Sequence, residues 1–142
     1  NMYLDAIKDF SWIVPQKVDS GYEHTYWTFA LKYEGHNKLG VTWKDFYNLH
    51  KQNGGDGFYG DLSLAYNEII MQEGTYYGTR ILKNSEVYPS EFKYPKGLCP
   101  NAESFQPKIM RFKTNYRNLD EAADKILVLK ATLKQVKKNE KF

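Results

Sequence analysis

A glycine-rich stretch, Gln52–Tyr66 (QNGGDGFYGDLSLAY), holds the residues of this chain best suited to contact a ligand. Four glycines, at positions 54, 55, 57 and 60, are interleaved with Asp56, Phe58 and Tyr59, and Asp61 follows. Glycine permits positive φ and close backbone approach, so such a loop can hold rings and carboxylates open to a ligand. The alternative is a connecting turn whose two rings fold back into the core. The residue types alone leave both interpretations open.

The other reactive side chains form no recognisable catalytic or metal-ligating pattern. His24, His36 and His50 are scattered, and the single cysteine, Cys99, has no companion at ligand spacing. No nucleophile elbow, phosphate-binding loop or dinucleotide fingerprint occurs. Cys99 fits a small apolar filler better than a nucleophile. The residues therefore predict a domain without a catalytic set or metal site of its own.

Composition indicates a globular protein. The 142 residues are 42% hydrophobic and 26% charged, with a net charge of +3 that is too small to indicate a nucleic-acid partner. No apolar run reaches membrane-spanning length and the start lacks a signal-peptide layout, so we expect a cytoplasmic protein without a membrane partner. Aromatic residues make up 16%, including 12 tyrosines, which predicts that part of the surface is covered by a partner.

Two elements are expected to position the glycine-rich stretch. A helix over Thr42–Asn53 has Thr42 as its N-cap and ends before Gly54. Its apolar positions recur at the helical spacing of one buried stripe: Trp43, Phe46, Tyr47 and His50. The clearest strand is Thr25–Glu34, in which Trp27, Phe29 and Leu31 alternate with polar positions.

The remaining chain predicts an α+β fold, one domain over residues 1–142, with an antiparallel sheet and helices packed on one face. We expect an extended edge segment at Phe10–Pro15, a turn at Gly35–Gly40 and a strand at Ile109–Thr114. Asn118 caps the best helix, with Glu121 completing a capping box. That helix is expected to bury Leu119, Ala122, Ala123, Ile126, Leu127 and Leu133. Between the strands we expect a helix at Leu62–Glu73, a long loop at Gly74–Pro100 and a short helix at Asn101–Lys108.

Several stretches resemble the C-terminal part of the DegT/DnrJ/EryC1/StrS family of pyridoxal-phosphate-dependent sugar aminotransferases, most closely its perosamine-synthetase-like branch. They are the opening YLDAI, then WIVPQKVDSGYEHTYWTFALKYEG, GVTWKDFYNLHKQNGGDGFYG and GLCPNAESFQPKIMRFKTNYRNLDEAADK. The similarity covers nearly the whole chain and is weakest over Leu64–Lys93. This branch usually continues GDGFYG with Ala-Trp, whereas Asp61-Leu62 stands here.

The resemblance implies a type I (aspartate aminotransferase-like) fold, of which this chain would be the small C-terminal domain. Residues 1–9 would end the helix that links it to an N-terminal PLP domain, and the parent enzyme would be a homodimer. That large domain would supply the Schiff-base lysine and bind pyridoxal phosphate, so this chain alone is expected to be inactive. The glycine-rich stretch occupies the family's substrate loop, which makes Phe58, Tyr59, Asp61 and Asp56 candidate contacts for the nucleotide-sugar substrate.

Three functions stay open at this point. The parent would transfer an amino group from an amino acid, expected to be glutamate, to a nucleotide-linked keto-deoxy-sugar. A sugar-nucleotide dehydratase uses the same fold, and the small domain does not separate the two. The third possibility is a stand-alone carbohydrate-binding or interaction module whose tyrosines stack on sugar.

Overall fold

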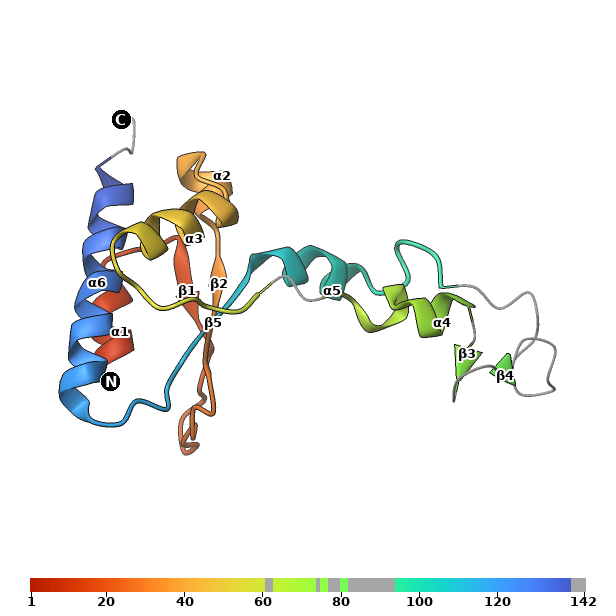
Figure 1. The fold of residues 1–142 in the computed structure, drawn as a ribbon, viewed down its shortest axis with the longest axis horizontal. Coiled ribbons are helices and arrows are strands. Elements are labelled where there is room, and N and C mark those ends of the chain that lie inside the picture. The colour runs from red at the N-terminus through yellow and green to blue at the C-terminus, as the bar shows by residue number, and fades with distance from the viewer. Residues whose placement is uncertain (61–62, 74, 77–79, 82–93, 139–142) are drawn as a thin grey trace. The chain divides into compact units, whose positions relative to one another are not determined.

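The structure is a computed structural model and describes residues 1–60, 63–73, 75–76, 80–81 and 94–138 (Figure 1). The chain forms two compact units, where the sequence predicts one domain. The first consists of Asn1–Gly60 and Lys108–Phe142, and the second of Asp61–Pro107.

A three-stranded antiparallel sheet organises the first unit. Its strands are β1 (Ile13–Pro15), β2 (Phe29–Tyr33) and β5 (Ile109–Phe112), in the order β1-β2-β5. Ile13 pairs with Tyr33 across β1 and β2, and Phe29 pairs with Phe112 across β2 and β5. The predicted edge segment is confirmed as β1, which ends at Pro15 where a missing N–H is tolerated.

Strand β2 begins later than the sequence predicts. Tyr26 has a φ of +48°, which an extended strand does not accommodate, so regular pairing starts only at Phe29. Phe29 and Leu31 are buried as predicted. Trp27 is 88% exposed, so its predicted place on their face is wrong.

Four helices belong to this unit: α1 (Met2–Ile7), α2 (Gly35–Leu39), α3 (Trp43–Gln52) and α6 (Leu119–Lys137). Helix α2 replaces the predicted turn and ends at Gly40, which adopts the left-handed conformation. Helix α3 begins at the predicted cap: Thr42 and Asp45 form a reciprocal capping box. Its stripe is confirmed, with Phe46 and His50 buried.

Helix α6 begins at the predicted cap, Asn118, and buries three of the predicted positions, Ala122, Ile126 and Leu133. The Asn118 side chain accepts a hydrogen bond from the Glu121 N–H at 2.8 Å, as a cap does. The Glu121 carboxylate accepts from the Arg117 N–H and not from that of Asn118, so the predicted reciprocal capping box is wrong. Leu119 is 77% and Leu127 63% exposed, so both predicted core positions are wrong. The buried residues follow a single helical stripe that includes neither: Ala122, Ile126, Leu129, Thr132, Leu133 and Val136.

The core lies between the sheet and these helices. The buried strand residues Phe29, Leu31, Tyr33, Met110 and Phe112 share one cluster with residues of α1, α3 and α6. In Figure 1 these three helices lie to one side of the sheet. The chain therefore contains a small α+β domain with a three-stranded antiparallel sheet. This agrees with the α+β class and the antiparallel sheet that the sequence predicts.

The second unit is built from short elements: η1 (Ala65–Asn67), α4 (Ile69–Glu73), β3 (Thr75–Tyr76), β4 (Arg80–Ile81) and α5 (Pro100–Phe105), after which η2 (Gln106–Lys108) leads into β5. The predicted helix at Leu62–Glu73 is instead η1 followed by α4, and the short helix at Asn101–Lys108 is confirmed as α5 with η2. The Tyr66 hydroxyl donates to the Glu103 carboxylate, which also accepts from the Gly97 N–H at 2.7 Å. Most of the predicted Gly74–Pro100 loop lies outside the described residues. Within the described part of the chain, no helix is long and apolar enough to cross a membrane.

Candidate functional site

The glycines of the loop after α3 fit against the aromatic stripe of that helix. A Cβ on Gly55 would lie 2.3 Å from the His50 ring, and one on Gly60 would lie 2.1 Å from the Ile109 carbonyl oxygen. At Gly57 the nearest atom would be the Tyr47 hydroxyl, at 3.2 Å. Because real Cβ atoms essentially never approach within 3.0 Å of other heavy atoms, close packing on α3 accounts for Gly55, and close packing on β5 and on Trp43 of α3 accounts for Gly60.

Phe58 and Tyr59 have opposite environments although they are neighbours. Phe58 is 4% exposed and packs against the rings of Trp43, Phe46, Tyr47, His50 and Phe112. This placement leaves no open ring face for a ligand, so Phe58 is a core residue and not a substrate contact. Tyr59 is 71% exposed.

Tyr59 is exposed at a fixed position. Its N–H donates to the Arg111 carbonyl at 2.9 Å, and the Arg111 N–H donates to the Tyr59 carbonyl at 2.7 Å. This antiparallel bridge attaches the loop to the free edge of β5. The backbone at Tyr59 is therefore held while its ring stays in solvent, as a preformed contact surface requires.

The exposed ring of Tyr59 borders a groove of about 620 Å³, entirely within the first unit. Three segments far apart in the sequence line it: Trp27 and Thr28, then Gly57 and Tyr59, then Arg111, Phe112, Lys113, Thr114 and Asn115. The walls are hydrogen-bonded to each other, since Thr28 Oγ1 donates to the Phe112 carbonyl at 3.0 Å and Thr114 Oγ1 to the Trp27 carbonyl at 2.9 Å.

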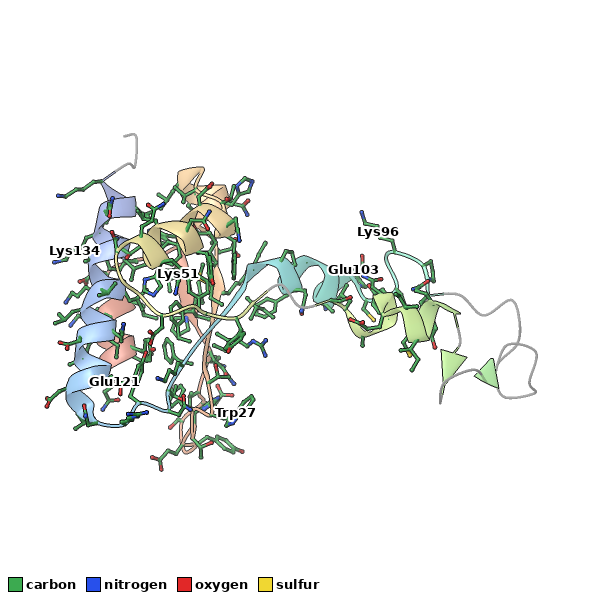
Figure 2. All side chains as sticks on the ribbon, viewed as in Figure 1. Trp27, Lys51, Lys96, Glu103, Glu121 and Lys134 are labelled. Atoms are coloured by element: carbon green, nitrogen blue, oxygen red, sulfur yellow. The ribbon has the colours of Figure 1, made fainter. Side chains whose placement is uncertain are left out.

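A strained residue directs Trp27 into solvent. The positive φ of Tyr26 is rare for a bulky side chain and persists only where surrounding contacts hold it. Here the Tyr26 N–H donates to His24 Nδ1 at 2.7 Å, and the two rings stack at 4.3 Å. His24 Nε2 lies 3.0 Å from Gln16 Oε1. Trp27 projects from the connection between β1 and β2 (Figure 2).

Two cations line the groove, in different surroundings. The Lys113 ammonium lies 3.4 Å from Glu121 Oε1 and 4.6 Å from the centre of the Tyr116 ring. Arg111 alternates with the buried Met110 and Phe112, so it lies on the sheet face away from the helices. Among the described residues its guanidinium forms no ion pair, and the lining contains no acidic residue.

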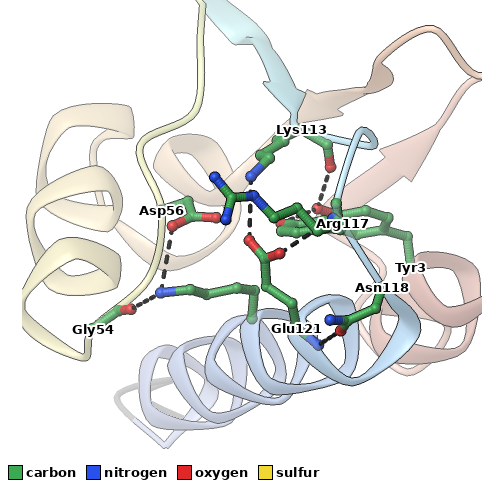
Figure 3. Close-up of polar contacts among 9 residues, drawn as sticks. Tyr3, Gly54, Asp56, Lys113, Arg117, Asn118 and Glu121 are labelled. Atoms are coloured by element: carbon green, nitrogen blue, oxygen red, sulfur yellow. Dashed lines mark hydrogen bonds and ion pairs between the residues drawn. The ribbon is translucent and has the colours of Figure 1, made fainter.

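Asp56 lies outside this lining and holds the loop to α6 (Figure 3). Its carboxylate is 3.4 Å from the Lys125 ammonium, which also donates to the Gly54 carbonyl at 3.2 Å. This ion pair gives Asp56 a structural partner. Asp61, the last predicted contact, lies outside the described residues.

The same network attaches helix α1 to the end of β5. The Tyr3 hydroxyl donates to the Lys113 carbonyl at 2.7 Å and lies 3.2 Å from the Tyr116 hydroxyl (Figure 3). Burial, followed by this contact, raises the pKa of Tyr3 well above its usual range. Tyr3 therefore stays a neutral hydrogen-bond donor and helps to fix the strand that carries the groove's cations.

His50 is a core residue. It is 2% exposed, its Nδ1 lies 3.5 Å from Thr132 Oγ1, and burial lowers its pKa to about 4. No group of three or more histidine, cysteine or acidic residues in the described part of the chain could hold a metal ion.

Of the residues that line the groove, the sequence predicted Tyr59 as a contact but did not indicate Trp27 and Arg111. The alternation of IMRFKT already places Arg111 opposite the buried Met110, and this was the available signal for it. Comparisons with protein-family models, with curated proteins and with solved structures found no match for this chain.

Proposed function

We propose that this chain is the small domain of a PLP-dependent aminotransferase acting on a nucleotide-linked keto-deoxy-sugar, of the DegT/DnrJ/EryC1/StrS type. One observation carries the proposal. The three long stretches that resemble this family supply the whole lining of one groove: residues 27–28, 57 and 59, and 111–115.

The groove has the chemistry that a nucleotide sugar requires. The exposed aromatic ring of Tyr59 offers an apolar face on which a sugar ring packs, and the exposed Trp27 adds a second ring to the groove. The polar side chains of Thr28, Thr114 and Asn115 border them. Arg111 adds a donor suited to phosphate. A neutral polysaccharide ligand would give this arginine no counterion, which favours the nucleotide-sugar enzyme over the stand-alone carbohydrate-binding module.

The residues of the groove do not fit pyridoxal phosphate itself. A lysine that forms an imine must present a neutral amine in an enclosed pocket. Lys113, the lysine of the lining, is instead paired with Glu121. In the proposed enzyme the cofactor and its lysine belong to an N-terminal PLP domain, and this chain contributes to substrate binding in a cytoplasmic homodimer.

The test uses the full-length product of the gene that encodes this chain. The protein is incubated with PLP, glutamate and a series of nucleotide-linked keto-deoxy-sugars, and products are identified by mass spectrometry. An amino sugar with glutamate-derived nitrogen is the expected result. Loss of a hydroxyl without gain of nitrogen would favour the dehydratase, and the absence of any PLP absorbance would overturn both enzyme functions.

A further inference from the structure

Arg111 is the groove cation available to a ligand. Lys113 already faces Glu121 and the Tyr116 ring, whereas the described residues provide no carboxylate for the Arg111 guanidinium. The backbone of Arg111 is fixed by two pairings, one with Ala30 of β2 and one with Tyr59 of the glycine-rich loop. A guanidinium in a groove whose described lining contains no acidic residue is complementary to phosphate, which it binds through two parallel hydrogen bonds.

Trp27 supplies a large planar surface on the same groove. Its indole is almost fully exposed, and the strained Tyr26 and the hydrogen bond from Thr114 to the Trp27 carbonyl fix its backbone. An exposed indole with a fixed backbone binds planar rings with little loss of conformational entropy. Nucleobases are such rings, and each base offers a face for stacking.

We propose that the groove binds the nucleoside diphosphate half of the substrate, with the diphosphate on Arg111 and the base stacked on Trp27. The identity of the substrate rests on the proposed function, while the positions of phosphate and base rest on the geometry of the groove. The 142-residue chain alone then binds nucleoside diphosphates, because the described lining residues all belong to its first unit.

Isothermal titration of the 142-residue chain tests this assignment with three kinds of probe. These are the nucleoside diphosphates UDP, GDP and dTDP, the corresponding uncharged nucleosides, and inorganic pyrophosphate. At least one nucleoside diphosphate should bind at least tenfold more tightly than its nucleoside and than pyrophosphate. Failure of all three diphosphates to bind at millimolar concentration would overturn the proposal.

Two variants separate the roles of the cation and the ring. Arg111→Gln should weaken nucleoside diphosphate and pyrophosphate binding by roughly tenfold and leave the nucleoside unchanged. Trp27→Ala should weaken diphosphate and nucleoside binding by a similar factor and leave pyrophosphate unchanged. Lys134→Gln is the charge-matched control, because Lys134 is an exposed residue of α6 outside the groove lining (Figure 2).

Two controls separate a specific loss of binding from a loss of folding or of charge. Melting temperatures of the variants should match that of the parent chain, so that lost binding is not lost folding. Binding that survives Arg111→Gln and Trp27→Ala, or that falls equally in Lys134→Gln, would overturn the proposal. If the variants behave as expected but the full-length protein makes no amino sugar, the groove assignment stands and the proposed function fails. If the protein makes amino sugar while the chain binds no diphosphate, only the groove assignment fails.

Discussion

The two faces of the β1-β2-β5 sheet have different roles: one packs against helices, and the other carries a residue of the groove. On the face covered by helices, Phe29, Leu31, Met110 and Phe112 are buried in a ring-rich core. On the opposite face, Arg111 lies between two of those core residues in the sequence yet lines the groove. Because side chains alternate along a strand, one residue separates a position that stabilises the fold from one that lines the groove.

The glycine-rich loop also places two neighbouring residues in opposite environments, one in the core and one in solvent. Phe58 joins the core and Tyr59 borders the groove, so the connector and the ligand-surface interpretations each describe one ring. Two of its glycines, Gly55 and Gly60, are explained by contact with α3 and β5. The density of glycines in this loop therefore indicates close packing, and the exposed ring of Tyr59 borders the candidate site.

The largest expected contrast is between the two adjacent rings. Phe58→Ala should lower the free energy of unfolding by about 3–5 kcal/mol, because it leaves a cavity among five rings. Tyr59→Ala should change it by less than about 1 kcal/mol, since it removes an exposed ring and keeps the backbone bridge. Urea unfolding of both variants measures the difference. Equal destabilisation would show that the loop does not divide core from surface.

The pH dependence of stability tests the buried face. The pKa of His50 is lowered from 6.5 to about 4, so the unfolded chain binds the proton more readily than the folded one. Stability should therefore be complete above about pH 6.5 and fall as the pH drops towards 4, by about 3 kcal/mol. The charge of Asp56 raises the pKa of His50, and the charges of Lys51 and Lys125 lower it.

A His50→Phe variant is the control for that curve. It keeps a ring in the aromatic cluster and removes the titrating group, so unfolding in urea between pH 4 and 7 should depend less on pH than in the parent chain. An unchanged dependence would show that other groups set the acid stability.

A pair of glycine substitutions gives a smaller effect. Gly55→Ala should destabilise by about 1–3 kcal/mol, because the new methyl group meets the buried His50 ring. Gly57→Ala should cost less than about 1 kcal/mol, since its nearest neighbour is the hydroxyl of the half-buried Tyr47. Thermal unfolding ranks the two. The opposite order would contradict packing on α3 as the reason for the glycines.

Local signals in the sequence predicted much of the fold. The capping residues Thr42 and Asn118 mark the starts of α3 and α6, and Pro15 ends the edge strand. The errors arose where tertiary contacts decide the conformation. No local pattern indicates the positive φ at Tyr26, which turns Trp27 away from the core, and the exposed face of α6 depends on how that helix packs.

The sequence predicted only part of the candidate site, because tertiary contacts bring its residues together. Tyr59 stands out in its own stretch, but Trp27 and Arg111 are 84 positions apart and reach one groove only through the pairing of β2 with β5. Sequence spacing does not show such a convergence, because the register of a long-range strand pair is set by which face of each strand is buried.

The most direct test of the open groove as the substrate site compares the two half-reactions of the full-length enzyme in Tyr59→Ala. Stopped-flow absorbance of the two cofactor forms separates them. Losing the packed ring should lower kcat/KM of the sugar half-reaction by roughly tenfold, or about 1–2 kcal/mol, and leave the amino-acid half-reaction nearly unchanged. Tyr22→Ala, which removes an exposed ring outside the groove, should change neither. Equal losses in both half-reactions, or a loss that follows a lowered melting temperature, would contradict a substrate contact at Tyr59.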